Sequence, residues 1–257
     1  MSVGCLADDL VIPPEQQRHY SEKVVYLPDC YQANDSKRRI AERTPTRVDA
    51  GLPDGAFVFC SFNASFKITP PIFGIWMRLL AAVDGSVLWL LEDNEAALAN
   101  LKRETEARGV DPGRLVFAPR VSVEDHLARH RLADLFLDTL PCTAHTTASD
   151  ALWAGLLLLT VPGHTFAGRV AASTLHAVGL DELIAPSLDA YEAMALALAR
   201  DPARLSSIRA RLARHRETYP LFDTARVTRH LEAAYSSMWE RSQAGEPPAG
   251  FAIAPPE

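Results

Sequence analysis

The sequence has 257 residues, of which 48% are hydrophobic and 23% charged, and its formal net charge is −6. A mildly acidic chain whose one basic cluster, Lys37-Arg38-Arg39, is short is a poor binder of nucleic acid. The sequence contains no run of about 18 apolar residues and therefore predicts no membrane span. Its first residues lack the basic and apolar regions of a signal peptide.

The first fifty residues resemble the end of a preceding domain more than the start of a new one. Residues 24–28 form a short strand-like run, and the polar stretch after them has too few apolar positions to build a core. We therefore expect residues 1–50 to be a remnant of a preceding domain and a connector from it.

From residue 51 onward, strand-like and helix-like segments alternate, with short loops between them. The strand segments are continuous apolar runs, as in buried parallel sheets. They cover residues 56–62, 86–92, 114–119, 134–139 and 156–161, with a last short strand at 183–186. Helical spacing covers residues 70–83, 94–109, 123–133, 149–155, 166–180, 191–201 and 202–219. This order predicts an α/β fold with a doubly wound parallel sheet, a Rossmann-like domain over residues 51–220.

Residues 221–257 are predicted to form one more long helix, whose onset Pro220 marks, followed by a proline-rich tail. We expect this tail, from residue 246, to be frayed. In doubly wound sheets, ligands bind beyond the carboxyl ends of the strands, so the loops after the strands are the places to look for function.

The loop after the first strand of the domain carries Lys67, just before a predicted helix N-terminus. A cation there is unfavourable against the helix dipole, unless an anion is bound between the two. The alternative is an ordinary solvated lysine. After the third strand, His126 falls in the first turn of a helix, where a neutral imidazole can stack on a base. The alternative is a surface or core histidine.

The loop after the fourth strand, LDTLPCTAHTTASDALWAG, is the most informative segment. Its helix is predicted to begin near Ser149, so that backbone N–H groups and the hydroxyls of Thr146 and Thr147 form an anion pocket. His145 can donate to a phosphate oxygen, and Asp150 can accept from a ribose hydroxyl. The alternatives are simple helix capping by the threonines and a dipole-complementing charge at Asp150.

Several familiar site patterns are missing from the sequence. It has no P-loop, no GxGxxG after a strand and no GxSxG nucleophile elbow. No two histidines stand at metal-ligand spacing beside a carboxylate, so we expect no metal site. The four cysteines are scattered without a CxxC pair, which is typical of reduced thiols in a cytoplasmic protein.

Three segments, FNASFKITP, FAPRVSVEDHLARHRLADLFLDTLPCTAHTTASDALWAG and PGHTFAGRVAAS, together resemble the C-terminal catalytic region of the protein O-GlcNAc transferase and Spindly-like family, glycosyltransferase family 41. The resemblance runs from about Val11 to about Phe251 and implies the C-terminal half of a GT-B glycosyltransferase. It makes residues 1–50 part of a preceding catalytic domain, residues 51–220 a UDP-sugar-binding domain, and the helix after residue 220 a crossover helix.

The resemblance implies transfer of a sugar, usually N-acetylglucosamine, from a UDP-sugar to Ser or Thr of proteins, without a metal or other cofactor. Lys67 would be the catalytic residue, because it contacts the diphosphate and helps the leaving group depart. The donor-binding residues implied are Lys67, Val121, His126, Cys142, His145, Thr146, Thr147 and Asp150.

Individual roles also follow from the resemblance. His126 packs on uracil and Asp150 holds the ribose, while Thr146 and Thr147 bind the diphosphate through hydroxyl and N–H groups. His145 stands beside the donor, and Cys142 stands near the sugar.

Two departures from the family keep an alternative open. Ala64 stands where relatives carry an amide side chain that touches the diphosphate, and the resemblance implies a first catalytic domain of which this sequence is expected to contain only the last piece. The alternative is a truncated UDP-binding protein, or a pseudoenzyme interaction module without turnover of its own.

Overall fold

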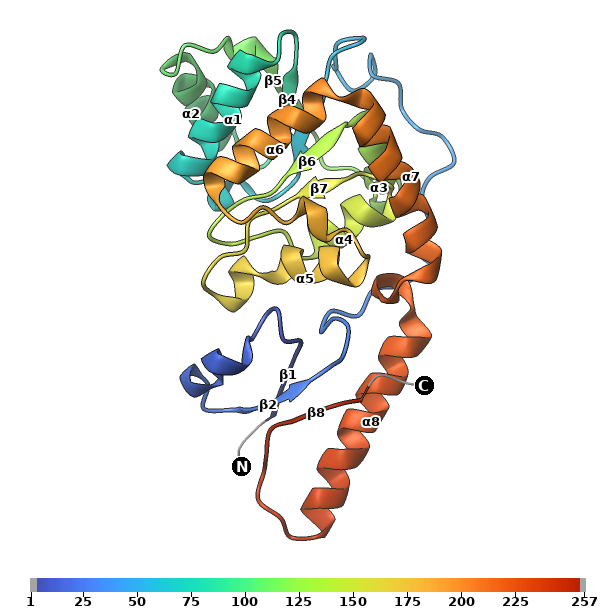
Figure 1. The fold of residues 1–257 in the computed structure, drawn as a ribbon. Coiled ribbons are helices and arrows are strands. Elements are labelled where there is room, and N and C mark those ends of the chain that lie inside the picture. Colours follow the sequence, from blue (N-terminus) through green and yellow to red (C-terminus); the bar gives the residue numbers. More distant parts are fainter. Residues whose placement is uncertain (1–3, 255–257) are drawn as a thin grey trace.

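The computed structural model describes residues 4–254, which form two parallel sheets and the helices around them (Figure 1). The larger sheet has the strand order β5-β4-β3-β6-β7, and the smaller one the order β1-β2-β8. The strands are β1 Gly4–Ala7, β2 Lys23–Tyr26, β3 Val58–Ser61, β4 Val87–Leu91, β5 Leu115–Ala118, β6 Leu135–Leu137, β7 Leu158–Leu159 and β8 Phe251–Ala252. The α-helices are α1 Pro70–Ala82, α2 Glu95–Glu106, α3 Val123–Arg129, α4 Thr146–Trp153, α5 Val170–Ala177, α6 Leu188–Arg200, α7 Pro202–Thr218 and α8 Thr224–Gln243.

The larger sheet confirms the predicted doubly wound, Rossmann-like arrangement. All its strands are parallel and each of the five lies within a predicted apolar run. Helices α1 and α6 pack together on one face, and α3, α4 and α5 on the other (Figure 1). The strand order reverses between β3 and β6, so the chain leaves these two neighbours in opposite directions and opens a crevice at their carboxyl ends.

Two element predictions in this domain need correction. The expected strand at residues 183–186 is only an isolated parallel bridge between Thr160 and Ile184. Helix α4 begins at Thr146, three residues before the expected start at Ser149. The first turn of α4 therefore contains both threonines of the HTT segment, because His145 rather than a later residue is its N-cap.

The smaller sheet gives the predicted strand at residues 24–28 two partners that the sequence did not reveal. β1 pairs with β2 on one side, and β8 pairs with it on the other, joining Val25 to Phe251. The prediction of a frayed tail is therefore wrong for residues 251–252. Gly250 permits the approach, since a Cβ there would lie 2.8 Å from the carbonyl oxygen of Val24.

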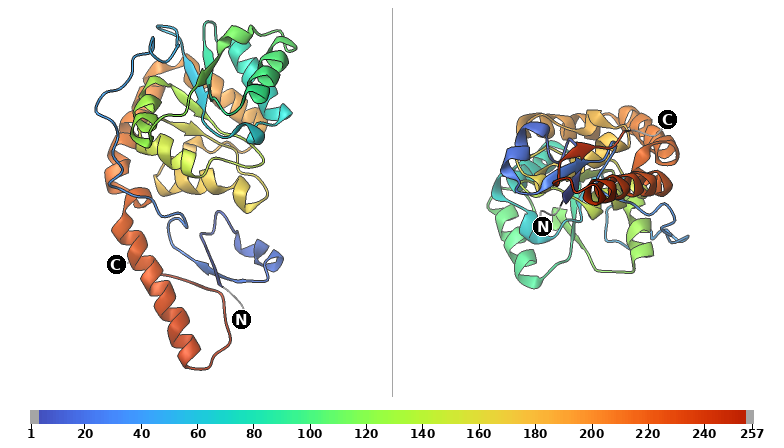
Figure 2. Two further views of the ribbon diagram at one scale, coloured as in Figure 1. Left: turned by 180° about the vertical axis from the view of Figure 1, so that it is seen from behind. Right: turned by 90° about the horizontal axis from the view of Figure 1, so that it is seen from below.

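Helix α8 leaves the helices around the larger sheet and runs along the smaller one (Figures 1 and 2). Its buried Ala234 packs with Val25 and Leu27. A second contact, through the buried Asp8, joins the smaller sheet to the larger domain. Asp8 Oδ2 accepts hydrogen bonds from Tyr31 N at 2.9 Å and from the Ser173 hydroxyl at 2.7 Å. Ser173 lies on α5, so the smaller sheet is tied to the larger domain by a satisfied buried carboxylate.

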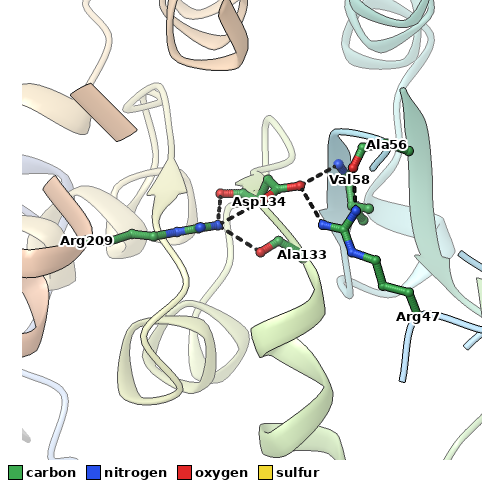
Figure 3. A network of polar contacts seen from close by, with 6 residues as sticks. All are labelled: Arg47, Ala56, Val58, Ala133, Asp134 and Arg209. Carbon is green, nitrogen blue, oxygen red and sulfur yellow. Dashed lines mark hydrogen bonds and ion pairs between the residues drawn. The ribbon is translucent and has the colours of Figure 1, made fainter. Parts of the chain in front are cut away.

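The amino ends of β3 and β6 are joined by a polar network around Asp134 (Figure 3). Asp134 Oδ2 accepts from Val58 N at 2.8 Å and from Arg47 Nη2 at 3.1 Å. Arg209 of α7 donates to the carbonyl oxygens of Ala133 and Asp134. This network lies at the opposite end of the strands from the crevice, so its role is to hold the connector and α7 on the sheet.

Candidate functional site

The loops after β3 and β6 face each other across the crevice at the strand switch point. Asn63, which follows β3, connects them. Its Nδ2 donates to Asp138 Oδ1 at 3.1 Å and to the Thr139 hydroxyl at 2.8 Å, and its Oδ1 accepts from the Thr147 hydroxyl at 2.5 Å. Asn63 is only 3% exposed, and its hydrogen bonds hold the first turn of α4 against the loop that follows β3.

Asp138 fixes the shape of the loop that follows β6. Its Oδ1 accepts from the backbone amides of Thr139 and Ala144, both at 2.7 Å, and its Oδ2 from the Thr160 hydroxyl at 2.6 Å. Burial raises the pKa of Asp138 to about 6, against the lowering effect of these hydrogen bonds. A fully buried carboxyl with four donors around it supports the turn and is too deep to contact a ligand.

Lys67 brings the positive charge of the site. It ends the short 3-10 helix η2, Ser65–Lys67, and its Nζ donates to the carbonyl oxygen of Thr143 at 2.9 Å. Within residues 4–254 this is the one hydrogen bond of the ammonium group, which has three donors. The lysine predicted from the loop after β3 therefore reaches the loop after β6, next to the N-terminus of α4.

The N-terminus of α4 has the features of an anion site. Among the described residues, no acceptor meets the backbone amides of Thr146 and Thr147, and His145 makes no side-chain cap. The hydroxyl of Thr147 is already donated to Asn63, which leaves its amide for a ligand. Thr146 is exposed, and among the described residues its hydroxyl has no hydrogen-bond partner, so this position is accessible to a ligand.

His145 is oriented by the loop after β7. Its Nε2 lies 3.1 Å from the carbonyl oxygen of Ala167, which also accepts from Thr143 N and the Thr143 hydroxyl. Burial, and then the charge of Lys67, lower the pKa of His145, which favours the neutral ring. Cys142 lies in the same turn, half-buried, with its Sγ 3.9 Å from the Thr143 carbonyl oxygen.

His126, a residue of α3, packs against other aromatic rings. Its ring centroid is 5.2 Å from that of Phe62 and 4.7 Å from that of His130. Burial and the neighbouring Arg129, which donates to His126 Nδ1 at 2.5 Å, lower the pKa of His126 to about 4. A neutral, partly exposed ring is suited to stacking on a base. Val121, 47% exposed, lies in the loop that precedes α3, the helix that carries His126.

Asp150 lies one turn further along α4 and is 8% exposed. It forms an ion pair with Arg38, a residue of the connector to which the sequence had assigned no role. Burial raises the pKa of Asp150, and the guanidinium of Arg38 partly offsets this effect. The sequence could not reveal this pair, because the two residues are 112 positions apart.

The predicted residues thus gather at one edge of the sheet. Lys67, Cys142, His145, Thr146 and Thr147 belong to one turn and the loop that faces it. Asp150 follows on α4, which contacts α3, the helix that carries His126. The charge of Arg38, the partner of Asp150, also contributes to lowering the pKa of His126. The sequence did not reveal the roles of Asn63 and Arg38, although the place of Asn63 directly after a central strand was a usable signal.

The described part of the chain shows neither a metal site nor a membrane-spanning helix. No three His, Cys, Asp or Glu side chains between residues 4 and 254 gather as a metal site, and no helix there has both the length and the apolar character to cross a membrane. Independence from metal remains a prediction.

The fold and the crevice define a class of protein, the Rossmann-like α/β domain of GT-B glycosyltransferases. More narrowly, the chain belongs to glycosyl transferase family 41, whose sequence model matches residues 40–231.

The relatives that the chain matches are longer than it is. It is 37% identical over 254 residues to the probable UDP-N-acetylglucosamine–peptide N-acetylglucosaminyltransferase SEC of Arabidopsis thaliana, covering 96% of this chain and 26% of that protein. It is 37% identical over 202 residues to the UDP-N-acetylglucosamine–peptide N-acetylglucosaminyltransferase of Caenorhabditis elegans, covering 79% of this chain and 18% of that protein. A solved structure of a variant O-GlcNAc transferase of Thermobaculum terrenum superposes with a TM-score of 0.85 at 30% identity, over 95% of this chain and 46% of that one.

Proposed function

We propose that this chain is the donor-binding part of a UDP-N-acetylglucosamine-dependent protein O-GlcNAc transferase. The observation that carries the proposal is the position of Lys67, whose ammonium group lies against the turn that starts α4, beside amides without acceptors. A lysine, a helix N-terminus and two threonines at a strand switch point together suit a diphosphate. Family membership and the printed names of the relatives supply the sugar and the protein acceptor.

The chemistry follows from where charge develops. In the transfer, the hydroxyl oxygen of a Ser or Thr side chain bonds to the anomeric carbon of the sugar, and the bond from that carbon to the β-phosphate oxygen breaks. The electron pair of the broken bond stays on the diphosphate, and the hydroxyl proton is released to the diphosphate or to solvent. Negative charge therefore grows on the leaving diphosphate. Lys67 and the amides of Thr146 and Thr147 stabilise that charge, and they do so more strongly in the transition state than in the bound substrate.

The nucleoside is proposed to lie along the rest of the site. A neutral His126 stacks on the uracil, Val121 in the loop before α3 lies near the nucleoside, and Asp150 accepts a hydrogen bond from the ribose. His145 and Cys142 then lie toward the sugar. The partners proposed are thus a UDP-sugar and a protein hydroxyl, in the cytoplasm and with no metal.

Calorimetric titration of the 257-residue chain with UDP tests the donor site. We expect binding, and Lys67→Ala should weaken it by roughly 10- to 100-fold, because a hydrogen bond to a charged group contributes about 1.5–3 kcal/mol. Lys102→Ala, on the exposed side of α2, is the matched control and should bind UDP as the unchanged chain does. No heat with UDP at millimolar concentration would reject the proposal.

A second candidate is binding without turnover. Two observations favour it: the chain spans about a quarter of the length of SEC, and Ala64, which precedes η2, offers no side-chain hydrogen bond. Incubation of the chain with radiolabelled UDP-N-acetylglucosamine and acceptor peptides distinguishes the two. Label on the peptide supports a transferase, and UDP binding without label supports the second candidate.

A further inference from the structure

Arg38 reaches the candidate site from outside the domain that forms it. It lies on the connector between the smaller sheet and β3, and this connector is fixed along α4 by several hydrogen bonds. The indole Nε1 of Trp153 donates to the carbonyl oxygen of Arg38 at 3.1 Å, and Gln32 Nε2 donates to the Ser149 hydroxyl at 2.6 Å. The position of Arg38 over α4 is therefore set by the backbone as well as by its own ion pair.

The ion pair between Arg38 and Asp150 uses only part of the carboxylate. Arg38 Nη1 donates to Asp150 Oδ1, whereas Oδ2 has no hydrogen-bond donor among the described residues. The Asp150 side chain is 11% exposed and that of Arg38 is 23% exposed. Oδ2 is not among the buried side-chain atoms that lack a partner, so it is open at the surface of the site to a hydrogen-bond donor from a ligand.

We propose that Arg38 is a positioning residue for the donor: it fixes the Asp150 carboxylate through Oδ1, so that Oδ2 is presented to one hydroxyl of the ribose. The proposal rests on the proposed function, in which Asp150 lies at the ribose. It adds a residue of the connector to a site otherwise built from the loops of the larger sheet.

The charges around the pair agree with this role. Burial raises the pKa of Asp150, and Arg38 is the charged group whose field opposes that rise. The same guanidinium, together with Arg129, disfavours protonation of His126. Arg38 thus favours an ionised acceptor at Asp150 and a neutral ring at His126.

Ribose analogues test the role of Arg38. The dissociation constants of UDP, 2′-deoxy-UDP and 3′-deoxy-UDP are measured by calorimetry for the unchanged chain and for Arg38→Ala and Arg38→Lys. We expect the unchanged chain to prefer UDP over one of the two deoxy analogues by roughly tenfold or more. Arg38→Ala should reduce this preference to about twofold or less while changing the affinity for that analogue little, and Arg38→Lys should restore part of it.

A matched control comes from the same connector. Arg47→Ala breaks the pair with Asp134 at the opposite end of the strands and should leave the preference for UDP unchanged. Absence of UDP binding by the unchanged chain would reject the proposed function itself. With UDP bound, a preference that survives Arg38→Ala, or an equal loss of affinity for all three ligands, would overturn the role of Arg38 alone.

Discussion

The hydroxyl of Thr147 donates to the side-chain oxygen of Asn63 at 2.5 Å, and this contact joins the first turn of α4 to the loop after β3. The same amide donates to Asp138 and Thr139 with its nitrogen. The register between β3 and β6 ends at the pair Cys60 and Phe136, before these loops begin. The buried Asn63 side chain therefore helps to align the loop that carries Lys67 with the first turn of α4.

Replacing this amide should damage both stability and binding. Asn63→Ala leaves the Thr147 hydroxyl without its acceptor and removes one of the four donors to Asp138, so we expect the free energy of unfolding to fall by about 1–3 kcal/mol. UDP affinity should fall severalfold, since the N-terminus of α4 is then free to shift. Urea unfolding and calorimetry measure the two effects. In contrast, Asn94→Ala removes only the cap of α2 and should cost about 1 kcal/mol with no change in UDP affinity. Unchanged UDP affinity in Asn63→Ala would argue against this alignment.

Asp138 should make stability depend on pH in an unusual direction. Its pKa is about 6 in the folded chain and about 3.9 when unfolded, so between these values the folded state binds more protons at this group. Its contribution to the free energy of unfolding therefore falls as pH rises from about 4 to 6, by up to about 3 kcal/mol. The difference in urea stability between the unchanged chain and Asp138→Asn should fall across this window and be constant above it.

Asp93 provides a control of opposite sign for this measurement. Hydrogen bonds from Ser65 lower the pKa of Asp93, so its stabilising contribution is present above the unfolded pKa and is lost as pH falls. The difference between the unchanged chain and Asp93→Asn should therefore rise with pH in the acid range. If the Asp138 difference also rose, its buried carboxyl would be ionised at low pH and the argument would be wrong.

Binding of the uracil base is expected to require a neutral His126 side chain. Because the pKa of His126 is about 4, uridine affinity should be constant between pH 5.5 and 8, as measured by ligand-observed NMR. His126→Ala should weaken UDP by roughly 5- to 100-fold, since stacking of a base on a ring contributes about 1–3 kcal/mol, and should leave pyrophosphate binding unchanged. His176→Ala, at an exposed position beside Asp181, serves as the control. An equal loss for pyrophosphate would contradict a role at the base.

The close approach of β8 to β2 gives a prediction about stability alone. A side chain at Gly250 would press on the carbonyl of Val24, so Gly250→Ala should lower the free energy of unfolding by about 1–3 kcal/mol. Gly74 lies inside α1, where a Cβ would find its nearest neighbour, in Arg78, at 3.7 Å. Gly74→Ala should therefore stabilise the chain by about 0.5–1 kcal/mol. Urea unfolding measures both effects. An unchanged free energy of unfolding in Gly250→Ala would show that β2 and β8 move apart at little cost to accommodate the side chain.

Most of the larger domain could be predicted because its signals are local. Buried parallel strands are continuous apolar runs, and each of the five predicted runs contains an observed strand. The predicted start of α4 was three residues too late. Thr146 and Thr147 are of a residue type that commonly caps helices, whereas the true N-cap, His145, makes no side-chain capping bond. The tail was misjudged because β8 has two residues and no pattern of its own.

The sequence alone determined which residues stand on the loops after the strands, and therefore which ones share an edge of the sheet, because carboxyl ends of parallel strands lie together. It placed Lys67, His126 and the HTT segment at the carboxyl edge of the sheet for this reason, although it put the start of α4 three residues too late. Only the tertiary structure decided that Asn63 ties the two loops together, that Arg38 holds Asp150, and that Phe251 pairs with Val25. These contacts join residues far apart in the chain, and their formation depends on how whole elements pack, which no local pattern of residues records.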